Sequence, residues 1–145
     1  MSNIEIIEYD SKYQKEVKHF VLTTLKEFGF DYKPEWDYDL NDPNKYYEAF
    51  FVLRDDDEIK GTIAIKHHNN ETAEIKRLYI DPNTRGKGYG SKLFDKALDF
   101  VKKKKFKKVI LDTWIRFETA VILYKKRGFK EIKTEGEQIF MEKAL

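Results

Sequence analysis

Alternating apolar and polar positions predict four strands in the first part of the chain. These strands are Ile4–Tyr9, Ala49–Leu53, Ile59–Lys66 and Thr72–Ile80. Between the first two, apolar residues at helical spacing run from a cap at Asp10 or Ser11 to a stop at Gly29, which predicts one helix. An acidic turn at residues 55–57 joins the second and third strands, so we expect these two to form an antiparallel hairpin.

The second half of the chain alternates helices with strands. Its longest regular pattern lies between Gly86 and Lys104, where the apolar residues form one broad stripe. A strand at Val109–Leu111, a helix at Phe117–Lys126 and a final strand at Gln138–Glu142 follow. Hairpins followed by strand–helix–strand units predict an α/β (α+β) fold. Its mixed sheet is expected to be antiparallel in the first half, with a parallel crossover in the second.

The segment from Phe30 to Leu40 follows neither pattern and is rich in acidic and aromatic residues. Its carboxylates, Asp37 and Asp39 among them, could hold a cationic amine by ion pairing, and its rings by cation–π contact. A solvated acidic loop would have the same composition, so the sequence leaves the two interpretations open. A short helix is expected to follow, from Asp42 through Tyr47.

Composition narrows the classes of function. The chain has 145 residues, of which 41% are apolar, so residues 1–145 are expected to form a single domain with one core. It contains no cysteine, which excludes disulfides, thiolate metal sites and a cysteine nucleophile. No apolar run approaches the roughly 20 residues of a spanning helix, and the N-terminus does not resemble a signal peptide. A cytoplasmic protein without membrane association is therefore expected.

Charge and histidine content bear on two other classes of partner. The net charge is only +2, and the lysine run at residues 102–108 is the one feature that suits a basic nucleic-acid-binding module. Cations also favour the C-terminal end of a helix, and Phe106 is the only aromatic residue interleaved with these lysines. We therefore expect no specific nucleic acid partner. His67 and His68 have no third ligand nearby in sequence, so no metal site is expected.

Three glycines at alternate positions follow a strand end and open the longest helix. The first amides of a helix point outward with partial positive charge, and glycines let a phosphate approach the backbone closely. The segment therefore predicts a pyrophosphate site, with Arg85 and Lys87 at its rim. P-loop spacing is absent, and the dinucleotide fingerprint fails because its last glycine falls one position early. The acyl-CoA pattern R-x-x-G-x-G fits Arg85, Gly88 and Gly90. The alternative is a glycine-rich turn that only permits close strand–helix packing.

Two further segments, taken with this loop, resemble a known family. Ala73–Pro82 supplies the strand before the loop, and Ala120–Phe129 supplies a helix with a Gly-Phe stop. Together they resemble the GNAT superfamily of acyl-CoA-dependent N-acyltransferases, most strongly from Thr72 to Phe129. The resemblance implies acetyl-CoA as co-substrate and a V-shaped splay between the fourth and fifth strands. It implies cofactor contacts at Leu78, Tyr79, Ile80, Arg85, Gly86, Lys87, Gly88, Tyr89, Gly90 and Ser91.

The resemblance also implies catalytic roles. An amide of residues 78–80 would stabilise the oxyanion, Glu74 would be the general base and Tyr124 the general acid. Each side chain has a plainer interpretation: Glu74 as an exposed strand residue paired with a neighbouring lysine, and Tyr124 as a core tyrosine. One residue departs from the family pattern. Many members carry an asparagine that reaches the pantetheine arm where this chain has Phe117.

The function expected from these features is N-acetyl transfer from acetyl-CoA to a primary amine, by direct attack in a ternary complex. The acceptor would be a small-molecule or peptide amine, and the sequence does not decide between them. Dimers are common in the family, so a homodimer is a further expectation. A catalytically inactive acyl-CoA sensor would share every one of these features, and a nucleic-acid-binding module is the weaker alternative.

Overall fold

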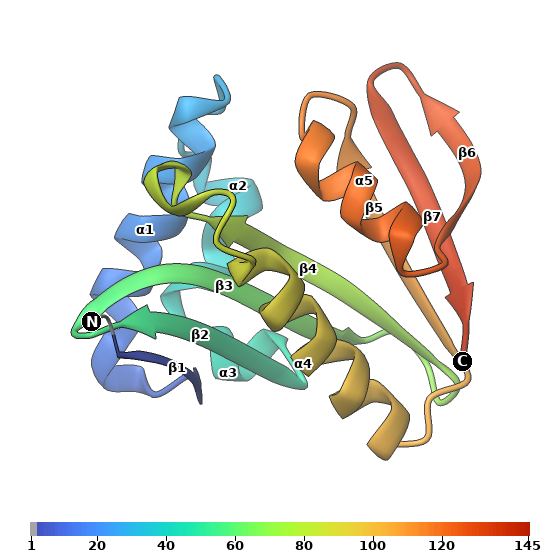
Figure 1. Cartoon of the computed structure of the whole chain (residues 1–145), viewed down its shortest axis with the longest axis horizontal. Helices are drawn as coiled ribbons and strands as arrows, with labels where there is room; N and C mark the ends of the chain where they lie inside the picture. Colours follow the sequence, from blue (N-terminus) through green and yellow to red (C-terminus); the bar gives the residue numbers. More distant parts are fainter. Residues whose placement is uncertain (1–2) are drawn as a thin grey trace.

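A seven-stranded sheet forms the centre of the computed structural model, which describes residues 3–145 (Figure 1). The strands are β1 (Ile4–Glu8), β2 (Ala49–Asp55), β3 (Glu58–His67), β4 (Thr72–Ile80), β5 (Lys108–Trp114), β6 (Lys130–Glu135) and β7 (Gln138–Ala144). The α-helices are α1 (Gln14–Glu27), α2 (Pro34–Asp37), α3 (Pro43–Tyr46), α4 (Tyr89–Lys103) and α5 (Glu118–Lys126). Short 3₁₀ turns lie at η1 (Ser11–Tyr13), η2 (Tyr38–Asn41) and η3 (Pro82–Thr84).

The strand order β1-β2-β3-β4-β5-β7-β6 confirms the predicted fold class. β1 with β2, β2 with β3 and β3 with β4 pair antiparallel, as do β5 with β7 and β7 with β6. The one parallel pair among the described strands is β4 with β5, and α4 is the crossover between them. Neighbouring parallel strands need a connection of about a dozen residues or more, because the chain has to return to the end of the sheet at which the first strand began.

Helices cover both faces of the sheet (Figure 1). Helix α4 packs on β2, β3 and β4, because its apolar stripe includes the fully buried Leu93, Phe94 and Ala97. On the opposite face, Val17 and Val21 of α1 pack with Val52 and Ala64 of the sheet. The sheet is therefore apolar on both sides near its centre, as expected for strands that helices cover on both faces.

Strand β4 diverges from β5 after only three paired residues. Their pairing runs from Thr72 to Glu74, and beyond Glu74 the edge of β4 that faces β5 has no strand partner among residues 3–145. An extra residue in β4 marks the start of the divergence, since Ala64 pairs with Lys76 while Thr62 pairs with Tyr79. This bulge bends the strand. The V-shaped splay predicted between the fourth and fifth strands is confirmed.

Arg77 occupies the bulge and connects it by hydrogen bonds to β3 and to the segment that contains α2 and η2. Its φ of +56° is unusual for a residue with a side chain, and the hydroxyl of Thr62 donates to its carbonyl at 2.8 Å. Its guanidinium donates to Asp39 Oδ1 at 2.7 Å, to Asp39 Oδ2 at 3.0 Å and to Asp37 Oδ1 at 3.1 Å. The Tyr47 hydroxyl also donates to Asp39.

This buried network corrects the expectation for the acidic segment. Asp37 and Asp39 are 6% exposed and form ion pairs with Arg77, so the interpretation as a solvated loop is wrong for these two residues. Both carboxylates also line one of the two pockets of the candidate site, and their role toward a cationic acceptor stays a prediction. The segment also contains regular structure, α2 and η2, where an irregular stretch was expected. Sequence reasoning failed here because the partner of these carboxylates lies nearly forty residues away.

Two further differences concern the C-terminal part. Strand β6 was not predicted, because all six of its residues are exposed and their sequence has no apolar alternation. It forms an edge strand by backbone pairing with β7. Strand β5 extends from Lys108 to Trp114, well beyond the three residues expected. Within the described residues, every helix is too short or too polar to span a membrane.

Arg77→Met tests the buried network. The substitution leaves two buried carboxylates side by side without a cation, and it should lower the free energy of unfolding by about 3–5 kcal/mol. Arg127→Met is the matched control, since Arg127 also binds a carboxylate with two nitrogens (Asp95, 2.7 and 3.1 Å) but on the surface. Urea unfolding should show a much smaller loss for the control. Equal losses in the two variants would contradict the account.

Candidate active site

The glycine loop forms an open cradle at the start of α4. Gly86 and Gly88 have φ values of +88° and +80°, which favour glycine, and α4 begins at the next residue, Tyr89. A Cβ atom placed on either glycine would meet no atom within 4 Å. The glycines are therefore not required by strand–helix packing at these two positions. The space beside them is open to a ligand.

Hydrogen-bond donors and a positive side chain border this cradle. The amides of Gly90 and Ser91 lie in the first turn of α4 and donate to no acceptor among the described residues. The Arg85 guanidinium lies 5.1 Å from the Phe28 ring and 3.8 Å from Glu27 Oε2. Donors at a helix N-terminus with an adjacent arginine are suited to a pyrophosphate group.

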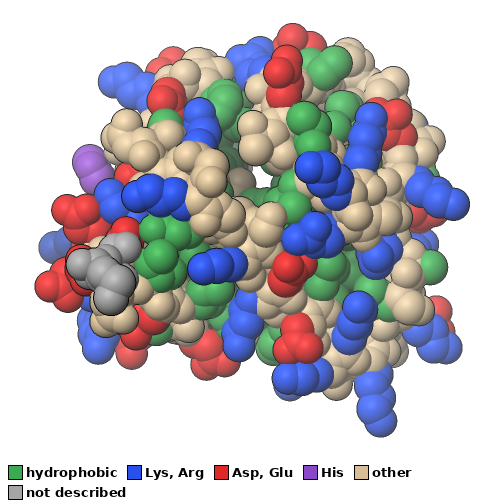
Figure 2. All heavy atoms as spheres, viewed as in Figure 1, with side chains coloured by type: hydrophobic (Ala, Val, Ile, Leu, Met, Phe, Trp, Pro, Cys, Tyr) green, Lys and Arg blue, Asp and Glu red, His purple; other side chains and the backbone are tan. Residues whose placement is uncertain are grey.

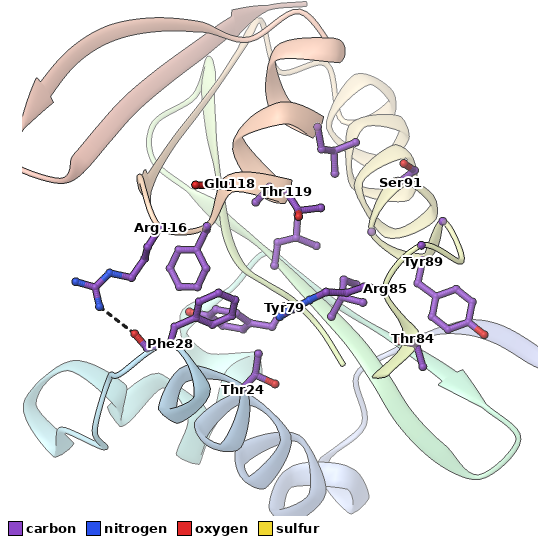
Figure 3. A pocket seen from close by; sticks show the side chains of 18 residues that line it. Thr24, Phe28, Tyr79, Thr84, Arg85, Tyr89, Ser91, Arg116, Glu118 and Thr119 are labelled. Carbon is purple, nitrogen blue, oxygen red and sulfur yellow. Dashed lines mark hydrogen bonds between the residues drawn. The ribbon is translucent and has the colours of Figure 1, made fainter. Parts of the chain in front are cut away.

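A pocket of about 540 Å³ extends from the cradle along β4 toward α5 (Figure 3). Nine of the ten residues predicted to contact a cofactor line it: Leu78, Tyr79, Ile80, Arg85, Gly86, Gly88, Tyr89, Gly90 and Ser91. The tenth, Lys87, is exposed and lies outside its wall. Tyr89 is 2% exposed and its hydroxyl donates to Asp55 at 3.1 Å, so its ring belongs to the core.

A second pocket, of about 550 Å³, lies on the other side of the splay. Its walls come from α2, η2, β4, β5 and α5. Four residues line both pockets: Leu78, Tyr79, Phe117 and Ala120. The two pockets therefore meet between β4 and the start of α5, where the sheet has opened. Figure 2 shows the molecule hollowed in this region, between the positions of α1 and α5 in Figure 1.

Tyr124 lines the second pocket from α5, one turn after Ala120. It is 5% exposed, and its ring lies 5.2 Å from that of Phe94 and 6.1 Å from that of Phe129. Burial raises the pKa of the Tyr124 hydroxyl well above its ordinary value, and the neighbouring Tyr79 and Asp112 add to the effect. The hydroxyl therefore keeps its proton at neutral pH and is available as a hydrogen-bond donor.

Glu74 lies at the closed end of the splay, outside the walls of both pockets. Its carboxylate lies 3.5 Å from the Lys76 ammonium, and the same ammonium lies 3.7 Å from Asp112 Oδ1. Asp112 itself does line the second pocket, and Gln138 Nε2 donates to it at 2.8 Å. Asp112 is thus a carboxylate of the candidate site that the sequence analysis missed. The available signal was an acidic residue between Leu111 and Thr113 of a buried strand.

Comparisons with known proteins decide the family. The model of the acetyltransferase (GNAT) family matches residues 17–129. The chain belongs to the GNAT family. An uncharacterised N-acetyltransferase of Schizosaccharomyces pombe is 31% identical over 122 residues, which are 79% of this chain and 75% of that protein. One of Methanocaldococcus jannaschii is 38% identical over 63 residues, 42% of this chain and only 27% of that protein.

Solved structures agree with the GNAT fold. A GNAT acetyltransferase of Staphylococcus aureus is 27% identical, with a TM-score of 0.90 and 99% of each chain covered. The PaiA N-acetyltransferase of Thermoplasma acidophilum, solved in complex with coenzyme A, is 24% identical, with a TM-score of 0.83 and 99% of each chain covered. The second of these likenesses shows the fold alone.

Phe117, which replaces the asparagine of many GNAT members, belongs to a cluster of aromatic rings. The Phe117 ring lies 4.5 Å from the ring of Phe28 and 6.0 Å from that of Phe30, both from the segment that ends α1. It also lies 6.5 Å from the Tyr79 ring. An aromatic cluster therefore stands where the resemblance places an asparagine, and two of its rings, those of Phe117 and Tyr79, line both pockets.

Gly88→Val tests the cradle. A valine side chain would occupy the open space beside the loop and should abolish the thermal stabilisation by acetyl-CoA. For the unchanged protein that stabilisation should be about 2.7 kcal/mol at 100 times the dissociation constant. Gly136→Val is the matched control: Gly136 also has a positive φ (+60°) and open surroundings, but it lies in the β6–β7 turn. Undiminished acetyl-CoA binding by Gly88→Val would contradict the assignment.

Proposed function

We propose that the protein transfers an acetyl group from acetyl-CoA to a primary amine, by direct attack in a ternary complex. The observation that carries this proposal is the meeting of two pockets at Leu78, Tyr79, Phe117 and Ala120. One pocket ends in a glycine cradle that can hold a pyrophosphate, and the other is lined by several carboxylates, Asp112 among them, and by the Tyr124 hydroxyl. Membership of the GNAT family supports the same reaction.

The donor occupies the first pocket. Its pyrophosphate accepts hydrogen bonds from the amides of the loop and of the first turn of α4, with Arg85 as counter-charge. To reach it, the Arg85 guanidinium leaves the weak contact with Glu27. The pantetheine arm runs along the free edge of β4, whose backbone groups at residues 78–80 can pair with its amides as an added strand would. The thioester then lies where the two pockets meet.

The acceptor amine occupies the second pocket, near Asp112. A carboxylate there can bind the ammonium form and, with Lys76 and Gln138 holding it in place, accept one proton directly or through water. Glu74, which the family resemblance names as the base, would have to act through Lys76 or through water because it lines neither pocket. A small-molecule amine and the N-terminus of a peptide both fit this chemistry.

The reaction balances without a protein nucleophile. The neutral amine attacks the thioester carbonyl, and a backbone amide of residues 78–80 stabilises the oxyanion. The C–N bond forms, the C–S bond breaks and the amine loses its second proton. Tyr124 gives its hydroxyl proton to the departing thiolate and is reprotonated from the amine through the site. The products are the N-acetyl amine, coenzyme A and one proton released to solvent.

Tyr124→Phe tests the acid and keeps the buried ring. If Tyr124 protonates the thiolate, kcat should fall about 10- to 1000-fold, with acetyl-CoA affinity nearly unchanged. Stability should change by about 1 kcal/mol at most, since one hydroxyl is removed. A coupled thiol-release assay against an amine panel measures kcat. Tyr9→Phe, at a buried tyrosine outside both pockets, is the control. A loss of stability with unchanged kcat would make Tyr124 a structural residue.

Asp112→Asn and Glu74→Gln together locate the carboxylate that handles the amine. Asp112→Asn keeps the size of the side chain and should raise the acceptor KM about tenfold or more, the size of one lost charged hydrogen bond. The acetyl-CoA KM should change little.

Glu74→Gln tests the other carboxylate. If Glu74 takes the proton, this substitution should remove the acidic limb of the pH–rate profile and lower the rate on the order of 100-fold. Wild-type acceptor kinetics in both variants would exclude both carboxylates.

A further inference from the structure

We propose that Phe117 sets the acyl-donor specificity of the site, by limiting the acyl group to short chains such as acetyl. The proposal rests on the proposed function, because it concerns the donor of that reaction. It starts from the residue at which the chain departs from the family pattern. A polar contact to the pantetheine arm is replaced there by a ring, and the ring lines both pockets.

The position of the acyl group follows from the arrangement of the pockets. The thioester enters from the first pocket and the amine from the second, so the carbonyl carbon lies at the residues that line both. Of these four, Ala120 is small, and Leu78 and Tyr79 belong to β4, along which the pantetheine runs. Phe117 is the bulky side chain on the opposite, α5 side. An acyl chain that extends past the carbonyl therefore extends toward its ring.

The ring is held in place from several directions. Its backbone is fixed at the start of α5, where the Phe117 amide donates to Trp114 O at 2.9 Å and its carbonyl accepts from Val121 N at 3.0 Å. On the α1 side, the Phe28 and Phe30 rings pack against it, and the Phe30 ring lies 5.6 Å from that of Trp114. The ring cannot turn toward α1 without displacing these neighbours.

Arg116 braces these neighbours. Its guanidinium donates to the Phe28 carbonyl at 2.9 Å and lies 4.9 Å from the Phe30 ring. Figure 3 shows the first of these contacts, from the connection between β5 and α5 to the end of α1. It also donates to Glu137 Oε2 at 2.9 Å, in the β6–β7 turn. The wall that faces the acyl group is thus tied to three segments. A rigid wall rejects a longer chain by steric overlap, whereas a mobile one would adapt.

The test compares straight-chain donors. Acetyl-CoA, butyryl-CoA and hexanoyl-CoA are assayed with one amine acceptor, using the unchanged protein, Phe117→Ala and Phe117→Leu. In the unchanged protein, kcat/KM should fall about 100-fold or more from acetyl to hexanoyl. Phe117→Ala should reduce this ratio to about tenfold or less, with Phe117→Leu between the two. Phe100→Ala is the matched control, since Phe100 is also half-buried but lines neither pocket.

Equilibrium binding separates this proposal from the proposed function. Calorimetry with coenzyme A, acetyl-CoA and hexanoyl-CoA needs no acceptor and no turnover. The unchanged protein should bind hexanoyl-CoA about tenfold or more weakly than acetyl-CoA, and Phe117→Ala should bind the two alike with unchanged affinity for coenzyme A. If these affinities are observed but no acceptor is acetylated, the proposed acetyltransferase activity is rejected and the role of Phe117 in selecting the acyl group stands. Equal affinities in the unchanged protein, or an unchanged ratio in folded Phe117→Ala and Phe117→Leu, would overturn the inference.

Discussion

The separation of β4 from β5 is the constraint on which the rest of the structure depends. The two strands share only three paired residues, and the bulge at Arg77 then directs β4 away. Arg77 has an unfavourable positive φ, and its guanidinium is a buried charge. Ion pairs with Asp37 and Asp39 offset the cost of the buried charge, and the hydrogen bond from Thr62 to the Arg77 carbonyl stabilises the backbone conformation. Both pockets lie in the gap that this creates.

The two sides of the gap have different chemistry because different elements border them. The crossover helix α4 begins at one end, and its first turn brings amide donors and glycines to the donor side. On the other side, β5 and α5 bring Asp112 and Tyr124, a carboxylate and a buried hydroxyl. Arg77 is shared by both sides: it fixes the strand edge that faces the donor, and through its carboxylate partners it fixes α2 and η2 in the wall that faces the acceptor.

The aromatic cluster around Phe117 gives the meeting point of the pockets its shape. Rings from α1, β4, β5 and α5 pack there, and Arg116 links them to the β6–β7 turn. The β6–β7 turn and the exposed strand β6 line neither pocket, and the turn is connected to the site by the Arg116 guanidinium. Phe117 is also the residue that stands where many family members carry an asparagine.

The sequence by itself determined what depends on near neighbours. The glycine spacing before α4 and the apolar periodicity of β4 and α4 are local signals, and the loop, the mixed sheet and the splay followed from them and from the family resemblance. Tertiary structure alone decided the partners of Asp37 and Asp39, the place of Asp112 and Glu74 relative to the pockets, and the pairing of the exposed β6. The physical reason is the same each time: a charge or an edge strand takes its role from a partner distant in sequence, and residue type does not encode which partner folding will bring near.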